Sequence, residues 1–348
     1  MYNENQENYY ERILANSISS MNPSEKAKQR AREKSPLYFE DLKRRLLLDF
    51  EGKRLTDIKN SEIISTNLGD TLKITTKEKI NFKIEDNDFK NQINHNLKLL
   101  PKIGVKKEEN LKSKGYSTID SLKEHDVYGD IASKFLDELD DLSFCEIMDL
   151  LDNNKYSKKC RDNLLKCISM TDCENFKFMD IETKGLSNVP VILIGVAEIK
   201  GKDIVCSQYF LRDYPEEDAV LDAYLSHLDE DSVHVTFNGK SFDVPFIKNR
   251  CTYNRISANL DLPHLDLMHF AKNLWRDELP NCKLQTIERE FFGIERKDDV
   301  PGQYIPEYYD TMYMDGYTPY EILYATRKKM YREYQEREAA KQRAREES

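Results

Sequence analysis

FKFMDIETKG, residues 176–185, is an apolar segment that ends in a pair of acids. Its composition is typical of a buried β-strand, and Asp180 and Glu182 stand two residues apart where the strand ends. Because side chains alternate between the two faces of a strand, both carboxylates point to the same face. Two acids on one face repel each other unless a cation lies between them. Hard oxygen ligands suit Mg²⁺ or Mn²⁺, so the segment predicts a divalent metal site.

The chain downstream supplies a third acid. Segments 191–199 and 204–210 predict two strands joined by a turn, and 216–228 predicts a helix. Residues 232–237 predict another strand, which runs into VTFNGKSFDVPFI, residues 235–247. Asp243 therefore opens a helix just beyond a strand end, where its carboxylate can reach toward the acids of a neighbouring strand.

These motifs resemble those of a known family. The order DIETKG and then NGKSFD resembles the first two motifs of the DEDD 3′-to-5′ exonucleases. The stretch HLDLMHFAKNLWRDELPNCKLQTIEREFFGIERKDDVPG, residues 264–302, resembles more narrowly the YprB-type branch of RNase H-like exonucleases. The resemblance covers residues 176–320 and implies an α/β fold: an RNase H-like mixed five-stranded sheet flanked by helices.

The resemblance also implies a mechanism and its residues. Asp180, Glu182 and Asp243 would be the catalytic carboxylates, holding Mg²⁺ or Mn²⁺ for two-metal phosphodiester hydrolysis of DNA or RNA. Three further residues are expected to support the site: Asn238, Lys240 and Asp266. Taken singly, each acid has an ordinary explanation as a strand-end, solvated or helix N-terminal residue. Three in this order favour a metal-dependent 3′-to-5′ exonuclease.

The fourth acid of the family is missing from the sequence. These exonucleases carry a last aspartate four residues after a His or Tyr that acts as general base. Thr326 and Met330 stand at those places, and neither can bind a metal or take a proton. Asp310 and Asp315 lie earlier, and neither follows a His or Tyr by four residues. The alternatives are a weakened or inactive nucleic-acid-binding protein with the same fold, or a structure-selective nuclease.

A second motif lies upstream in LKLLPKIGVKKEENLKSKGYSTIDSLKEH, residues 97–125. It resembles the helix-hairpin-helix element of DNA-repair proteins, except that Lys102 and Glu108 replace a glycine and a small residue. Seven lysines against four acids give a local excess of positive charge. Backbone N–H groups at a helix N-terminus can bind a phosphate without reading sequence. The expected nucleic-acid contacts are Lys102, Ile103, Gly104, Lys106 and Lys107; the alternative is an ordinary helical hairpin.

Composition limits the remaining possibilities. The net charge of -10 over 348 residues argues against a protein that coats nucleic acid by bulk electrostatics. The 7 cysteines show no zinc spacing and are expected to be free thiols. No segment has the apolar length of a membrane span or the pattern of a secretory signal. We therefore expect a cytoplasmic protein that does not associate with a membrane.

The sequence predicts five parts. Residues 1–34 form a polar tail, 35–95 a helix with a small β element, and 96–170 a helical region with the hairpin motif. Residues 171–325 form the RNase H-like exonuclease domain, and 326–348 a charged C-terminal helix.

Overall fold

The computed structural model describes residues 36–49, 53, 57–81, 89–153, 167–294, 296 and 300–315. The polar tail and the charged C-terminal helix expected from the sequence lie outside these residues. The chain divides into two compact units. Among the described residues, one unit holds 36–49, 53 and 300–315, and the other holds the rest. The domain boundaries expected from the sequence remain a prediction.

The smaller unit is a pairing of helices distant in sequence. The helix predicted to start near Pro36 is confirmed, and its buried Phe39 packs on Tyr304, with ring centroids 4.8 Å apart. Tyr308 donates its hydroxyl to the Phe39 carbonyl over 2.6 Å. The elements are α3 (Pro36–Asp49), η8 (Gly302–Tyr304) and α13 (Ile305–Asp315).

The larger unit is built on one mixed sheet, which confirms the α/β class. Its strand order is β1-β2-β5-β4-β3-β6-β7; β3 pairs antiparallel with β4 and parallel with β6. The strands are β1 (Ser61–Thr66), β2 (Gly69–Lys79), β3 (Phe176–Thr183), β4 (Val191–Lys200), β5 (Asp203–Phe210), β6 (Val233–Thr236) and β7 (His264–Asp266).

The sheet has seven strands, so the expected number of five is wrong. Strands β3 to β6 lie where the sequence predicts them, and β7 is the fifth strand of the expected sheet. The additional two, β1 and β2, are the small β element expected within residues 35–95. They form a hairpin that turns at Gly69, with a φ of 127°, and pairs through β2 with β5. Leu72 and Ile74 of β2 are fully buried there. The sequence places this β element outside the RNase H-like domain, because the local sequence of a hairpin does not indicate which distant strand it will pair with.

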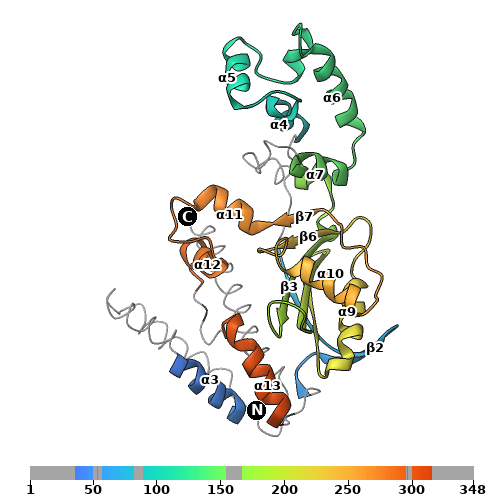
Figure 1. Ribbon diagram of the computed structural model, residues 1–348, viewed down its shortest axis with the longest axis vertical. Coiled ribbons are helices and arrows are strands. Elements are labelled where there is room, and N and C mark those ends of the chain that lie inside the picture. Colours follow the sequence, from blue (N-terminus) through green and yellow to red (C-terminus); the bar gives the residue numbers. More distant parts are fainter. Residues whose placement is uncertain are drawn as a thin grey trace. The chain divides into compact units, whose positions relative to one another are not determined.

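The two faces of β3 are covered differently. Tyr224 donates its hydroxyl to the Met179 sulfur, which puts helix α9 over the face of Met179 and Ile181. Figure 1 shows α9 (Glu217–Leu225) and α10 (Asp243–Tyr253) next to each other at the sheet, and the two helices are in contact. Alternation along β3 puts Phe178, Asp180 and Glu182 on the other face.

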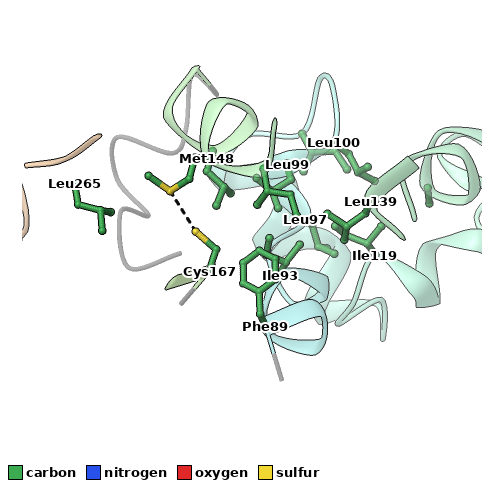
Figure 2. Close-up of a cluster of buried hydrophobic side chains, with 14 of the residues drawn as sticks. Phe89, Ile93, Leu97, Leu99, Leu100, Ile119, Leu139, Met148, Cys167 and Leu265 are labelled. Carbon is green, nitrogen blue, oxygen red and sulfur yellow. Dashed lines mark hydrogen bonds between the residues drawn. The ribbon is translucent and has the colours of Figure 1, made fainter. Parts of the chain in front are cut away.

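The helical region expected before β3 is confirmed and has its own core. Figure 2 shows Ile93, Leu97 and Leu100 among its buried side chains, with Cys167 donating to the Met148 sulfur. The same cluster includes Leu265 of β7. The elements are α4 (Phe89–Asn94), η2 (Leu97–Leu99), α5 (Val105–Ser113), η3 (Asp120–Glu124), α6 (Gly129–Asp141), α7 (Phe144–Asn153), η5 (Cys167–Met170) and η6 (Cys173–Asn175).

The remaining elements follow β5 and β7. They are η7 (Tyr214–Glu216), α11 (Leu267–Trp275) and α12 (Leu284–Phe292). In the part of the chain that the structure describes, no helix has the length and apolar character needed to cross a membrane.

Candidate active site

The first two acids lie at the end of β3. Asp180 is exposed and Glu182 is half-buried, whereas Ile181 between them is buried. This burial pattern confirms the predicted alternation, with both carboxylates on one face of the strand. The pairing of β3 with β4 becomes irregular just beyond, between Glu182 and Thr183, so the acids stand where the regular sheet ends.

Asp243 reaches this strand from the first residue of α10, as the sequence predicts. Its side chain is only 6% exposed. The backbone N–H of Ile181 donates to the Asp243 Oδ1 atom over 3.1 Å. This hydrogen bond ties the helix to the strand at the residue that separates Asp180 from Glu182.

The pKa of Asp243 is raised to about 7. Burial is the main cause, because a desolvated carboxylate is disfavoured. The negative charge of Asp180 acts in the same direction, and that of Glu182 adds a smaller effect; the hydrogen bond from Ile181 opposes them. The three acids therefore interact electrostatically, and both burial and the neighbouring negative charges disfavour the ionised form of Asp243.

The turn before α10 is held by Asp266. The Oδ1 atom of Asp266 accepts from the backbone N–H of Asn238 over 2.8 Å, and Oδ2 accepts from that of Lys240 over 3.2 Å. Oδ1 also accepts from the Met268 N–H over 3.1 Å and caps α11. Asp266 thus fixes the backbone that delivers Asp243, while Asn238 and Lys240 contribute main-chain donors.

Gly239 makes this turn compact. Its N–H donates to Thr236 Oγ1 over 3.1 Å, and a Cβ atom at this position would lie 2.6 Å from Thr236 Cβ. A side chain therefore does not fit. The preceding Asn238 has a φ of 75°, a left-handed conformation that asparagine tolerates better than most residues.

The donor set fits a hard divalent cation in its chemistry. It offers carboxylate oxygens, and a cation would reduce the repulsion between Asp243 and the other two acids. Among the described residues, however, no three His, Cys, Asp or Glu side chains are arranged closely enough to hold an ion.

The position of the missing fourth acid is only partly covered by the structure. Asp310 lies in α13 and is half-buried. Thr326 and Met330 lie outside the described residues, as does the side chain of Asp315.

The upstream lysine-rich turn has a defined shape. Lys102 has a φ of 66°, the left-handed conformation for which glycine is the usual residue. Ile103 is fully buried, and Gly104 precedes the first turn of α5 without a side-chain cap. The side chains of Lys102, Lys106 and Lys107 are exposed. The turn therefore presents exposed cations, but the Ile103 N–H is not available to a phosphate, because it donates to the Leu100 carbonyl over 3.3 Å.

Glu108 stands in the first turn of α5, but its carboxylate is bound by groups of the helical region. It is buried, accepts from the backbone N–H of Leu97, and forms ion pairs with Lys98 and Lys112. These ion pairs lower the pKa of Glu108 against the opposing effect of burial. Its negative charge is therefore neutralised within the helical region.

Two contacts near the acids were missed by the sequence analysis. Lys184, two residues beyond Glu182, donates to the Tyr214 hydroxyl. Arg250 of α10 forms a buried ion pair with Glu217 of α9 and so anchors the helix that carries Asp243. The motif DIETKG displays the lysine, but no local pattern reveals partners some 30 residues away.

Comparison with known proteins gives a consistent result. Residues 177–321 match the model of the RNase_H superfamily. A stretch of 140 residues is 35% identical to YprB of Bacillus subtilis (strain 168), covering 39% of this chain and 34% of YprB. A stretch of 144 residues is 30% identical to a PolC-type DNA polymerase III of Caldanaerobacter subterraneus subsp. tengcongensis, covering 34% of this chain and 10% of the polymerase.

A solved structure is also similar over part of the chain. The family B DNA polymerase of Pyrobaculum calidifontis aligns with a TM-score of 0.32 and 17% identity, over 42% of this chain and 23% of the polymerase. The chain thus spans about a third or less of each of these relatives. The chain therefore carries an RNase_H-like region, matched at residues 177–321, and part of it is related in sequence to YprB.

Proposed function

We propose that this chain is a metal-dependent 3′-to-5′ exonuclease that hydrolyses phosphodiester bonds of DNA or RNA. The observation that carries the proposal is the buried Asp243 carboxylate, bound to the N–H of Ile181 and repelled by Asp180 and Glu182. A protein keeps such a cluster at a cost in stability, and clusters of this kind are enriched at functional sites. The RNase_H superfamily match supports the nuclease class.

The residues have distinct roles in this proposal. Asp180, Glu182 and Asp243 would hold Mg²⁺ or Mn²⁺, which supplies an activated water and a counter-charge for the leaving oxygen. Asp266 keeps the turn in place, and the α9–α10 ion pair keeps α10 in place. The exposed Lys102, Lys106 and Lys107, with the backbone of Gly104, would bind phosphates of the same nucleic acid.

The experiment compares linear and circular single strands. Full-length protein is incubated with 5′-labelled linear DNA, the same strand circularised, and a matched RNA, with Mg²⁺, Mn²⁺ or EDTA. The proposal expects a descending ladder from linear strands, intact circles, and no products in EDTA. Asp180→Asn and Asp243→Asn should remove the ladder, whereas Glu230→Gln, an exposed acid elsewhere, should not. Cut circles, or a ladder that survives Asp180→Asn, would contradict it.

A second candidate is a nucleic-acid-binding protein with little or no turnover. It is favoured by Thr326 and Met330, which stand where the family carries a base and a fourth acid. The same assay distinguishes the two: the binding protein retains both strands in a gel shift but releases no nucleotides with either metal.

A further inference from the structure

A lysine and a tyrosine sit at the end of the sheet where the acids lie. Lys184 follows the last residue of β3, and its backbone N–H donates to the Pro190 carbonyl just before β4 begins. Tyr214 follows β5 in the short helix η7. Because β3 ends, β4 begins and β5 ends at this edge, the two residues share it with Glu182.

The side chains of the pair are held in a specific geometry. The Lys184 ammonium donates to the Tyr214 hydroxyl and lies 4.9 Å from the centre of the Tyr214 ring. The backbone N–H of Tyr214 is fixed by Asp213, which accepts it over 2.7 Å. Thr183 fixes the other side by donating its hydroxyl to the Gly185 carbonyl over 2.6 Å. Both side chains are half-buried, so the ammonium is positioned rather than freely swinging.

A positioned cation has a clear use beside three acids. A phosphodiester that approaches Asp180, Glu182 and Asp243 adds negative charge to a cluster that already repels itself. An ammonium group at the same edge of the sheet offsets this negative charge and can donate a hydrogen bond to a non-bridging phosphate oxygen. Lys184 lies two residues beyond Glu182, where the chain turns from β3 toward β4.

We propose that Lys184 is a substrate-binding residue of this site, contacting a phosphate of the bound strand, and that Tyr214 is the positioning residue for its ammonium. The proposal rests on the proposed nuclease function, since it assumes that a nucleic-acid strand passes the three carboxylates. The ligand class is a single-stranded nucleic-acid backbone, and the contact reads no base.

The test measures binding in EDTA, so that cleavage does not enter. Affinity of full-length protein for fluorescein-labelled oligothymidylate and for a matched RNA is followed across a salt series. Lys184→Gln should weaken binding about fivefold to tenfold and flatten the salt slope by about 0.7 log units. Lys184→Arg should retain most of the slope. Tyr214→Phe, which keeps the ring and loses the hydroxyl, should weaken binding about threefold, with the slope kept.

Lys202→Gln is the matched control, because this exposed lysine lies at the opposite end of β4. Thermal melting of each variant identifies loss of fold. If folded Lys184→Gln binds like Lys202→Gln with an unchanged slope, the inference is wrong, whatever the activity. If the Lys184 effect is present while the wild type cleaves no strand with either metal, the nuclease proposal fails and the binding role stands. Absence of wild-type binding overturns both.

Discussion

The backbone N–H of Ile181 and the carboxylate of Asp243 are joined by a 3.1 Å hydrogen bond, so the acid of α10 is attached to the strand between its two acids. This hydrogen bond stabilises the Asp243 carboxylate, whereas burial and the negative charges of Asp180 and Glu182 disfavour its ionised form. The attachment point is a backbone group, so its place depends only on β3 being a strand. The fold therefore attaches Asp243 to the strand segment that carries Asp180 and Glu182.

Asp243→Asn should make the metal-free protein more stable. The raised pKa means that the folded protein binds a proton more readily than the unfolded chain between pH 3.8 and about 7, and ionised Asp243 destabilises the fold above that range. Linkage sets an upper limit of about 4 kcal/mol, and we expect about 2 kcal/mol at alkaline pH after solvent and backbone relaxation. Urea unfolding in EDTA measures it, with Glu230→Gln as control. A loss of stability would contradict the repulsion.

Restoring the missing residues should raise the rate. The double variant Thr326→His plus Met330→Asp supplies a base and a fourth acid, a contribution of about 10² to 10⁴ in rate. We also expect the wild type to prefer Mn²⁺ to Mg²⁺ and the double variant to lose that preference. Initial rates on 5′-labelled single strands measure both. Equal rates for the two proteins would mean that another acid already completes the site.

Removing the lysines of the upstream turn should reduce the salt dependence of binding. Replacing Lys102, Lys106 and Lys107 by Ala should flatten the slope by about 2 log units if all three contact phosphates. The loss should be similar for every sequence tested. The control replaces three exposed lysines outside this turn: Lys77, Lys79 and Lys202. A slope equal to that of the control would leave only a structural role for the turn.

Asp266→Ala should damage the site by releasing its turn. Three backbone N–H groups lose their acceptor, which we expect to cost about 2 to 4 kcal/mol of stability. Asp266→Asn keeps one carbonyl oxygen and should lose about half as much. Calorimetric Mn²⁺ binding should weaken in parallel. Asp172→Ala, a helix cap with a single N–H partner, should change neither metal affinity nor activity.

His234 should make the fold sensitive to acid. It is fully buried, neither ring nitrogen has a hydrogen-bond partner within the described residues, and burial lowers its pKa to about 4, with a smaller contribution from Lys248. Below pH 6.5 the unfolded chain takes up a proton that the folded chain refuses, so stability falls as pH drops toward 4.

The size of this effect is on the order of 3 kcal/mol across that window. Urea unfolding at pH values from about 7 to 4 should show a flatter decline for His234→Met than for the wild type. The exposed His95→Gln should behave as the wild type does. Parallel curves for His234→Met and the wild type would show that other groups carry the acid sensitivity.

The sequence predicted the parts of the site that local patterns control. Period-two alternation put Asp180 and Glu182 on one face, and the NGKSFD segment put Asp243 at a helix start. The sequence did not predict which distant residues contact one another in the fold. Nothing near Leu72 indicates that it will lie opposite Phe210, and nothing near Lys184 indicates Tyr214. Such contacts depend on how the whole sheet packs, and a local sequence pattern carries no information about that packing.

The hairpin β1–β2 has a consequence for how the chain is made. Its partner β5 is synthesised only after the entire helical region and two further strands, so the hairpin leaves the ribosome with its pairing edge unsatisfied. Closing so long a loop is slow, and an unpaired strand edge is a template for aggregation. A fragment that starts at β3 would have the complementary defect, because β5 would then be an open edge. Production of the RNase_H-like region should therefore begin ahead of residue 61, because the hairpin that covers the edge of β5 is translated before the strands that carry the acids.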